Sequence, residues 1–368
     1  MIETRDLFVG RTLDDKYLIE ERLGAGGMGT VYRGRHLSMD RPVAIKVLHQ
    51  RLVDDEAARV RFQTEARAAV MLQHSNAVSV ADFGQTSEGC VYIVMELLEG
   101  HTLREILNRE APLETARAIS VMLQAADAVA AAHEAGIIHR DLKPANILVT
   151  QSADQPAIVK VLDFGVAKLA ADKLDDETTT VVQQSSVIGT PRYMSPEQSN
   201  GSGLTPAADV YSLGVILYEM LTGMAPFTAA TRAEIAQKHA NDPPHAPREI
   251  VAAIPEDIER VVLHALEKQP GARPASAREF RRELLETAER LGLEHHALKS
   301  APDLETLRDA GVESPSGRLV VDISRLREKR ALSSGSNEIK VLGTKPLPKK
   351  PIEHISFLDR VKRILGLR

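Results

Sequence analysis

Polar residues that could carry out chemistry on a phosphate gather between His139 and Gly165. Asp141, Asn146 and Asp163 carry oxygen-bearing side chains and lie beside short apolar, strand-like runs. Mg²⁺ takes one or two carboxylates together with phosphate oxygens, and a carboxylate that is not committed to a metal can accept a proton from a hydroxyl. Any one of these residues alone would be typical of a polar loop that caps a turn. Their combination indicates a site that binds Mg²⁺ and moves a proton.

A glycine-rich segment, Gly24–Gly29, lies between two predicted strands. Because glycine has no side chain, backbone N–H groups there can approach phosphate oxygens closely. Dinucleotide-binding folds share this spacing, but in those folds a helix follows the glycines, whereas here Thr30–Tyr32 continues as a strand. On this motif alone, a glycine-rich hairpin that binds nothing remains an alternative to a phosphate-binding loop.

Lys46 is embedded in the aliphatic, strand-like run Val43–Leu48. Most strand lysines are solvated edge residues, but the helical segment that follows argues against that interpretation. Glu65 falls on the apolar stripe of this helix, three residues after Phe62 and four before Ala69. A carboxylate on a buried stripe needs a cationic partner, so we expect Lys46 to pair with Glu65.

The elements that must position these residues change type along the chain. Short strands separated by Gly, Asp or Pro turns come first, and helical periodicity predominates from Leu103 onward. Ser276 and Glu279 have the spacing of a capping box. Strands first and helices afterwards predict an α+β fold with a small β-rich lobe and a larger helical lobe. The expected strands are 17–23, 31–35, 43–48, 77–83 and 91–96, and the expected helices are 55–72, 114–135, 209–222, 232–240, 256–267 and 276–291.

Composition narrows the class of protein. Of the 368 residues, 43% are hydrophobic and 26% are charged, which is ordinary for a globular chain and excludes wholesale disorder. The net charge of −5 gives no global field that would attract nucleic acid. The one cysteine, Cys90, excludes a disulfide within the chain and fits a reducing compartment. No apolar run approaches the ~18 residues of a membrane span and no secretory signal is visible, so we expect a soluble, cytoplasmic protein.

Six motifs in order make residues 17–291 resemble a eukaryotic-type (Hanks-type) serine/threonine protein kinase, of the kind also found in bacteria. The resemblance implies a bilobal protein kinase fold, with a small β-rich lobe over about 17–96 that contains one helix and a larger helical lobe over about 100–291. The matching motifs are the glycine loop Gly24–Gly29, Val43–Lys46, Glu65, His139–Asn146, Asp163–Gly165 and Gly189–Glu197.

The resemblance extends to residues that support the site, and it has two departures. Asp209 resembles the buried aspartate that braces the catalytic loop, and Glu197 and Arg273 match the structural ion pair of the larger lobe. Ser195 stands where the family has alanine, and Tyr211 stands where many members carry tryptophan. Neither departure falls on a residue that the family uses for chemistry.

The resemblance also assigns roles in a transfer that depends on ATP and Mg²⁺. Asp141 would orient the substrate hydroxyl and receive its proton, and Lys143 would neutralise the γ-phosphate. Asn146 and Asp163 would bind Mg²⁺, while Lys46, held by the helix carboxylate, would contact the α- and β-phosphates. The other ATP-binding residues would be Leu23, Gly24, Ala25, Gly26, Gly27, Met28 and Gly29 around the phosphates, Val31, Ala44 and Leu148 around the adenine, Met95 behind it, and the backbone of Glu96 and Leu98 at its edge.

By the same resemblance, two residues indicate which class of hydroxyl accepts the phosphate. Lys143, two residues after Asp141, follows the serine/threonine pattern rather than the tyrosine pattern, and so does Thr190. The substrates would therefore be proteins with Ser or Thr acceptors. A pseudokinase scaffold is the alternative from another class, but such proteins typically lose the lysine, the base or the metal aspartate, and all are present. A kinase of small molecules is a third interpretation, which the intact segment 189–197 disfavours.

Regulation by phosphorylation is a further expectation from the resemblance. Arg140, directly before Asp141, is typical of family members that are activated by phosphorylation of the loop 163–197. Arg61 and Lys168 would complete a cationic pocket by analogy, and a dimer could carry out the autophosphorylation. Ser186 matches the usual acceptor position, and the rival acceptors are Ser185, Thr178, Thr179 and Thr180.

The two ends of the chain lie outside the resemblance. We expect residues 1–16 to be an N-terminal extension and residues 292–352 to be a flexible linker. Residues 292–368 hold fifteen basic and ten acidic residues, a net charge of +5, which leaves −10 for residues 1–291. Residues 353–368 have the pattern of a short basic amphipathic helix. Such a tail could dock on the kinase domain or a partner, contact a membrane surface, or stay disordered.

Overall fold

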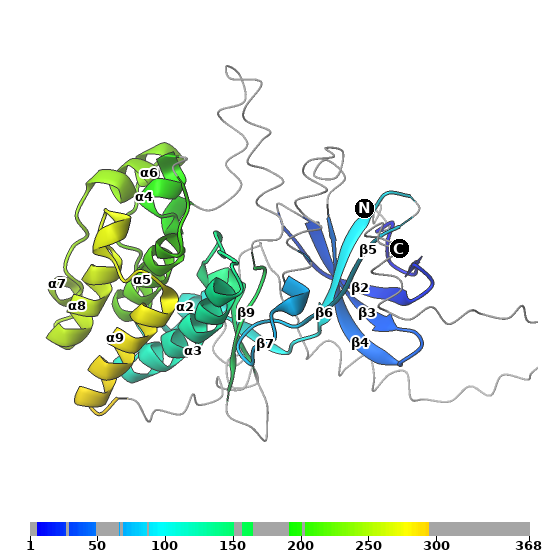
Figure 1. The fold of residues 1–368 in the computed structure, drawn as a ribbon, viewed down its shortest axis with the longest axis horizontal. Coiled ribbons are helices and arrows are strands. Elements are labelled where there is room, and N and C mark those ends of the chain that lie inside the picture. Colours follow the sequence, from blue (N-terminus) through cyan, green and yellow to red (C-terminus); the bar gives the residue numbers. More distant parts are fainter. Residues whose placement is uncertain are drawn as a thin grey trace, which may run out of the picture. The chain divides into compact units, whose positions relative to one another are not determined.

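The structure is a computed structural model of the chain (Figure 1). It describes residues 6–26, 29–48, 66, 69–86, 88–150, 157–164, 191–200 and 203–293. Most of the expected helix 55–72 therefore lies outside the described residues, and so does the tail from residue 294 onward. Outside them as well are Gly27, Met28, Arg61, Glu65, Lys168 and the loop residues Thr178, Thr179, Thr180, Ser185, Ser186 and Thr190.

A six-stranded antiparallel sheet forms the N-terminal part of the described chain. Its strand order is β1-β2-β3-β4-β6-β5. Because side chains alternate between the two faces of a strand, Ile45 and Val94 join one buried cluster while Lys46 faces the other way. Strand β1 lies within residues 1–16, so part of the expected extension joins the sheet. The bounds are β1 Thr12–Leu13, β2 Tyr17–Ala25, β3 Gly29–His36, β4 Arg41–Leu48, β5 Val80–Gln85 and β6 Val91–Glu96.

The strand expected at 77–83 is displaced, because β5 begins only at Val80. The residues before it bond instead to the backbone of Val161. The Val161 N–H donates to the carbonyl of Asn76 at 2.7 Å, and the Val78 N–H donates to the carbonyl of Val161 at 2.9 Å. A strand was predicted here correctly, but its start was placed three residues too early, because an apolar pattern does not reveal which distant segment supplies the backbone partners.

A second, three-stranded antiparallel sheet has the order β7-β8-β9. Its strands are β7 Gly100–Thr102, β8 Ile147–Thr150 and β9 Val159–Val161. Strand β8 begins directly after Asn146, and β9 ends two residues before Asp163. The small sheet therefore fixes the two segments in which the sequence places the metal ligands.

Five helices of the C-terminal part, α3, α5, α6, α8 and α9, follow the expected spans closely, whereas α2, α4 and α7 were not among the expected helices. Helices α3, α5, α8 and α9 pack against one another around one aliphatic core (Figure 1). Every residue of α5 after Pro206 is buried, as expected for a helix that is covered on all sides. The bounds are α2 Leu103–Glu110, α3 Thr115–Glu134, α4 Pro196–Asn200, α5 Pro206–Thr222, α6 Arg232–Asn241, α7 Pro247–Ile250, α8 Glu256–Ala265 and α9 Ala277–Arg290.

Side-chain caps define where several helices begin. Thr102 and Thr231 each form a complete capping box at the starts of α2 and α6. At α9 the expected box forms in part: the Ser276 side chain accepts from the Glu279 N–H, but the Glu279 carboxylate accepts from Ala275. The cap residue was therefore predicted correctly, and the reciprocal bond is displaced by one residue.

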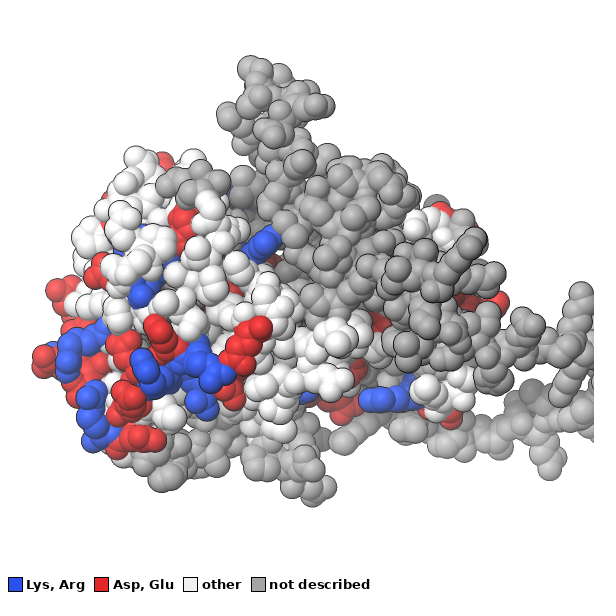
Figure 2. Space-filling model, viewed as in Figure 1, with Lys and Arg blue, Asp and Glu red and all other residues white. Residues whose placement is uncertain are grey.

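Charged side chains of both signs are interspersed over α7, α8 and α9 on the face shown in Figure 2. Several of them pair across or along these helices, as Arg248 does with Glu256 and His264 with Glu283. Among the described helices, none is both long enough and apolar enough to cross a membrane.

Candidate active site

The loop before β8 carries the proposed base. The Asp141 carboxylate accepts a hydrogen bond from the Lys143 ammonium at 2.6 Å. A 3₁₀ helix, Pro144–Asn146, turns the chain back, and the Asn146 amide donates to the backbone carbonyl of Asp141 at 2.9 Å and to its carboxylate at 3.3 Å. The structure therefore brings Asp141, Lys143 and Asn146 together, as the sequence predicts.

Asp209, in the first turn of α5, forms hydrogen bonds to the backbone of this loop. Its carboxylate accepts backbone hydrogen bonds from His139 at 2.7 Å and from Arg140 at 2.9 Å, and it bonds to the His133 ring at 2.9 Å. Desolvation raises the pKa of the Asp209 carboxyl, but the hydrogen bonds and charges of His133 and His139 together lower it by more, so the pKa lies below its usual range. The buried, ionised carboxylate can thus stabilise Arg140, whose backbone φ is +64°.

Lys46 and Asp163 meet across the two sheets. The Lys46 ammonium donates to the Asp163 carboxylate at 2.7 Å, and the Lys46 side chain is 11% exposed against 42% for Asp163. Desolvation raises the pKa of the Asp163 carboxyl, but the Lys46 charge and hydrogen bond, together with the charges of His139 and Lys143, lower it by more, so that pKa also lies below its usual range. The expected partner of Lys46, Glu65, lies outside the described residues.

The backbone connects Asp163 to the loop of Asp141. The Leu162 N–H donates to the carbonyl of Asn146 at 2.8 Å. The His139 ring lies 2.9 Å from the carbonyl of Leu162 and packs against the ring of Phe164 at a centroid distance of 5.0 Å. The two expected metal ligands are therefore held next to each other by main-chain contacts.

The residues present fit a magnesium ion at Asn146 and Asp163. The Asn146 amide nitrogen is committed to Asp141, which leaves its oxygen as the atom that a metal would take. The carboxylate of Asp163 is ionised and partly exposed. Mg²⁺ is a hard cation that prefers oxygen ligands, of which one or two come from side chains.

Most of the expected adenine-binding residues lie on strands of the six-stranded sheet, whereas Leu148 lies in β8 of the other sheet and Leu98 follows β6. Ala44 in β4 is paired with Met95 in β6, and Val31, Ala44 and Leu148 are buried, whereas Met95, Glu96 and Leu98 are half-buried. Leu23, Gly24 and Ala25 belong to β2, and the Gly26 N–H donates to the Gly29 carbonyl across the turn at 2.8 Å.

Gly29 has a structural reason as well as the expected functional one. A Cβ at this position would lie 2.3 Å from the carbonyl oxygen of Val47. Strands β3 and β4 therefore approach too closely for any other residue. The glycine at this end of the loop is required by the sheet whether or not a phosphate binds.

Lys160 is a site residue that sequence reasoning missed. Its ammonium donates to the Glu96 carboxylate at 2.8 Å, and the same carboxylate accepts from the Ser79 N–H at 2.8 Å. The side chain of Glu96 is thus tied to β9, three residues before Asp163. Like Lys46, Lys160 is a lone lysine in an apolar strand, and this signal could have found it.

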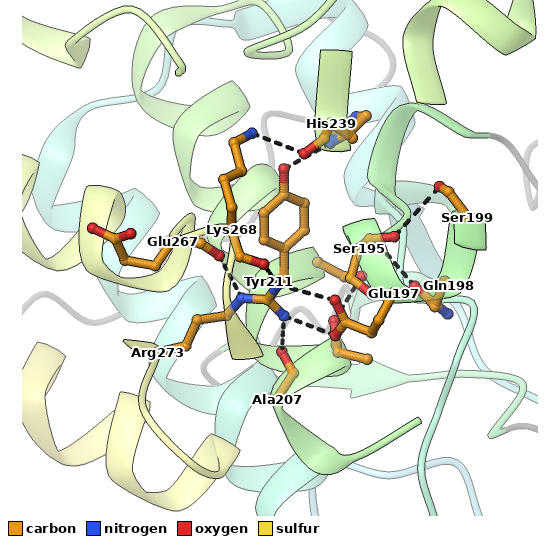
Figure 3. A network of polar contacts seen from close by, with 12 residues as sticks. Ser195, Glu197, Gln198, Ser199, Ala207, Tyr211, His239, Glu267, Lys268 and Arg273 are labelled. Carbon is orange, nitrogen blue, oxygen red and sulfur yellow. Dashed lines mark hydrogen bonds and ion pairs between the residues drawn. The ribbon is translucent and has the colours of Figure 1, made fainter. Parts of the chain in front are cut away.

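A second polar network supports the segment 191–200 (Figure 3). Arg273 and Glu197 form a bidentate ion pair at 2.8 and 3.0 Å, and the Arg273 side chain is fully buried. The Arg273 guanidinium lies 4.8 Å from the ring of Tyr211. From the same segment, the Gln198 amide donates to the carbonyl of Arg140 at 2.8 Å. This bond ties the segment to the loop of Asp141.

Arg104 forms a further network, which no motif or periodicity in the sequence predicts. From α2 it donates to both oxygens of Glu219 in α5, at 3.1 and 3.0 Å, and it also contacts the Tyr193 hydroxyl. The Tyr193 hydroxyl in turn donates to Glu219 at 2.6 Å. These partners are far apart in sequence, so no local pattern could pair them.

Comparison with known proteins agrees with the fold and with the kind of site described above. The sequence matches the protein kinase domain family over residues 17–285. It is 45% identical over 299 residues to serine/threonine-protein kinase pkn3 of Myxococcus xanthus, a match that covers 81% of this chain and 54% of that protein. It is 42% identical over 276 residues to serine/threonine-protein kinase PknB of Mycobacterium tuberculosis, covering 74% and 43% respectively. The chain thus spans about half the length of these curated relatives.

A solved structure has a similar fold. The crystal structure of the Mycobacterium tuberculosis PknI kinase domain matches with a TM-score of 0.61 at 26% sequence identity, and the match covers 77% of this chain and 100% of that one. The expected fold, a β-rich small lobe followed by a helical lobe, is confirmed.

Proposed function

This chain belongs to the protein kinase domain family, and from that premise we propose that it transfers the γ-phosphate of ATP to serine and threonine hydroxyls of proteins. The related proteins of Myxococcus xanthus and Mycobacterium tuberculosis are described as serine/threonine-protein kinases. Lys143, two residues after Asp141, supports the same acceptor class.

In the proposed reaction, the acceptor hydroxyl oxygen forms a bond to the γ-phosphorus while the bond from that phosphorus to the β–γ bridging oxygen breaks. ADP leaves, and the hydroxyl proton passes to the Asp141 carboxylate. Lys143, whose ammonium already contacts that carboxylate at 2.6 Å, is positioned to donate to the transferring phosphate. Lys46 holds the α- and β-phosphates, and the backbone of Gly24–Gly29 covers them.

Asn146 and Asp163 hold the metal in this proposal. A Mg²⁺ ion at these oxygens would neutralise the charge of the β- and γ-phosphates. The ion pair of Asp163 with Lys46 keeps the carboxylate ionised in the absence of the ion. The adenine lies between Val31, Ala44 and Leu148, with Met95 behind it and the backbone of Glu96 and Leu98 at its edge.

One observation carries the proposal. A continuous series of contacts joins Lys46 to Asp163, the segment of Asp163 to Asn146, Asn146 to Asp141, and Asp141 to Lys143. Each residue type that phosphoryl transfer requires is present in this series. A pseudokinase scaffold would have no need for all of them.

We extend the proposal to regulation and location. Autophosphorylation of the loop 163–197, with Ser186 as first acceptor, would place a phosphate of charge about −1.5 to −2 near Arg140. A cytoplasmic signalling role fits the sequence composition. Substrate proteins, dimerisation and contact of the tail with a membrane surface belong to the same proposal.

The test compares the purified wild type with Asp163→Asn, using ATP labelled at the γ-phosphate and a generic basic protein as acceptor. Asp127→Asn is the matched control, because Asp127 is 40% exposed and, among the described residues, pairs with Arg281 and His74 rather than with any residue of the proposed site. Removing the charge that binds the metal should lower transfer by about 100- to 1,000-fold, and the control should stay near wild type.

Acid hydrolysis of the labelled acceptor then identifies the modified residue. We expect phosphoserine and phosphothreonine without phosphotyrosine. Equal labelling by the wild type and Asp163→Asn, or label on tyrosine alone, would refute the proposal.

A further inference from the structure

Two consecutive backbone carbonyls between Asp163 and α4 are held by side chains from distant helices. The segment Pro191–Tyr193 forms a single 3₁₀ turn. The carbonyl of Tyr193 accepts from the Ser212 hydroxyl at 2.7 Å, and the carbonyl of Arg192 lies 3.0 Å from Nε2 of His239. Backbone carbonyls need a hydrogen-bond donor when water is excluded. The Ser212 and His239 side chains supply these donors, since the two carbonyls are not bonded within a strand or a helix.

The hydrogen-bond chemistry of His239 has one consistent arrangement. A carbonyl oxygen can only accept, so Nε2 of the ring carries the proton that it donates to Arg192. Nδ1 of the neutral ring then accepts from the Tyr211 hydroxyl at 2.9 Å. Burial, reinforced by the charge of Lys268, lowers the pKa of His239 to about 4, which keeps the ring neutral at pH 7.

The ring of His239 has no room to turn. It is fully buried and packs edge-on against Phe227 at 4.8 Å and Tyr211 at 5.6 Å. Its own carbonyl accepts from the Lys268 ammonium at 2.9 Å. Figure 3 shows Tyr211 between His239 on one side and the ion pair of Arg273 with Glu197 on the other. The position of the Nε2–H donor is thus fixed from several sides.

The segment that His239 holds also reaches the proposed base. Downstream of Arg192, the Gln198 side chain accepts from the Ser195 N–H at 3.0 Å and donates to the Arg140 carbonyl at 2.8 Å. Arg140 immediately precedes Asp141. Residues from the segment 191–198 therefore contact the loop of Asp141, where the acceptor hydroxyl would be placed in the proposed reaction.

We propose that His239 is a positioning residue for the acceptor protein: by donating to the carbonyl of Arg192, it fixes the segment beside which the acceptor chain lies. Ser212 assists through the carbonyl of Tyr193. This inference rests on the proposed function, since it concerns the acceptor of the same phosphoryl transfer. His239 touches neither ATP nor the reacting atoms, so its effect is expected on acceptor binding rather than on nucleotide binding.

Two amide substitutions distinguish the roles of the two nitrogens of the His239 ring. In His239→Gln, the side-chain NH₂ can reach the place of Nε2 and still donate to Arg192. In His239→Asn, the amide is one bond shorter: it can meet the Tyr211 hydroxyl but leaves the Arg192 carbonyl unbonded. Both variants lose the ring, so a merely structural role predicts similar defects. The control is His264→Asn, because His264 is 43% exposed on α8.

The readouts are KM for an acceptor peptide, KM for ATP, and kcat, measured on full-length protein. We expect His239→Asn to raise the peptide KM about tenfold, in line with leaving a buried acceptor unsatisfied, while KM for ATP changes by less than about twofold. His239→Gln should stay within about threefold of wild type. Ser212→Ala, which keeps its packing, should raise the peptide KM in the same direction and supplies the test if His239→Asn does not fold.

Three results would overturn the inference: equal peptide KM values for the Gln and Asn variants, parallel changes in KM for peptide and ATP, or an unchanged peptide KM in Ser212→Ala. The failure of the proposed function looks different. In that case the wild type itself transfers no phosphate, and the variants have no activity to compare.

Discussion

Single residues in this site depend on backbone conformations that side chains rarely adopt. Arg140 has φ of +64° and Asp163 has φ of +56°, in the left-handed region that is costly for residues with a Cβ. Asp209 stabilises the first through its bonds to His139 and Arg140. The Lys46 ion pair holds the side chain of the second. The residue types could be predicted from the motifs, but these conformations result from contacts that a sequence does not display.

A buried histidine also couples stability to pH. An unfolded chain protonates His239 near its ordinary pKa of 6.5, whereas the native ring, with its pKa lowered to about 4, stays neutral. Between these two pH values the unfolded state binds more protons than the native state. The contribution of His239 to the free energy of unfolding should therefore be complete above pH 6.5 and should decrease as the pH drops toward 4. The contribution of this group is about 3 kcal/mol.

Urea unfolding at several pH values between 4.5 and 7.5 checks this expectation. The groups that face the ring are Tyr211 and Lys268. In His239→Gln, which has no titrating ring, the decline over this range should be shallower than in wild type. Identical slopes in the two proteins would show that His239 is protonated equally in the native and unfolded states.

At the level of elements, sequence periodicity predicts helices and strands well where partners are local. Helices α3, α5, α6, α8 and α9 match their expected spans to within three residues at either end. Periodicity fails where the partner is remote: β5 begins late because the residues before it bond to β9. For the same reason, the sequence could point to Lys160 but not to its partner Glu96, and the bond of Arg104 with Glu219 could not be predicted.

The anchoring of α2 to α5 by Arg104 leads to a prediction about stability. The Glu219 side chain is 5% exposed, so Arg104→Met leaves a buried carboxylate without its cation. Breaking such a pair typically costs about 3–5 kcal/mol, and urea unfolding should show a loss of this order. Arg248→Met is the matched control, because the pair of Arg248 with Glu256 is 44% and 72% exposed and should contribute little.

The double variant Arg104→Met with Glu219→Gln distinguishes the cause. If the loss comes from an unpaired charge, neutralising Glu219 should restore most of the stability. A double variant as unstable as the single one would mean that Arg104 acts through packing instead.

At the scale of the whole molecule, the described part of the chain ends at a well-defined C-terminus of helix α9. Gly292 has φ of +65° after α9, and the Leu293 N–H donates back to the carbonyl of Ala288 at 2.9 Å, a glycine-based termination. The domain boundary near 292 stays a prediction, as does the basic amphipathic helix at 353–368, because the tail lies outside the described residues. The end of α9 at Gly292 is compatible with the boundary, whereas composition alone supports the helix at 353–368.

Deleting residues 341–368 tests the proposed role of the tail. We predict that this segment lies outside the packed domain, so kcat and KM on a generic peptide should stay within about threefold of the full chain after its removal. The set of cellular proteins recovered with the kinase should change. Loss of activity or of solubility on truncation would show that the tail belongs to the catalytic domain.

Asp141 is the most important residue of the proposed reaction, because we assign it as the group that takes the proton from the acceptor hydroxyl. The direct measurement is the single-turnover rate of phosphate transfer to a protein acceptor by the wild type and by Asp141→Asn, with nucleotide affinity determined on the same preparations. Asparagine keeps the shape of aspartate but cannot act as a base. We expect the transfer rate to fall by about 100- to 10,000-fold, with nucleotide affinity within about threefold of wild type. A transfer rate within about tenfold of wild type at unchanged nucleotide affinity would contradict the assignment.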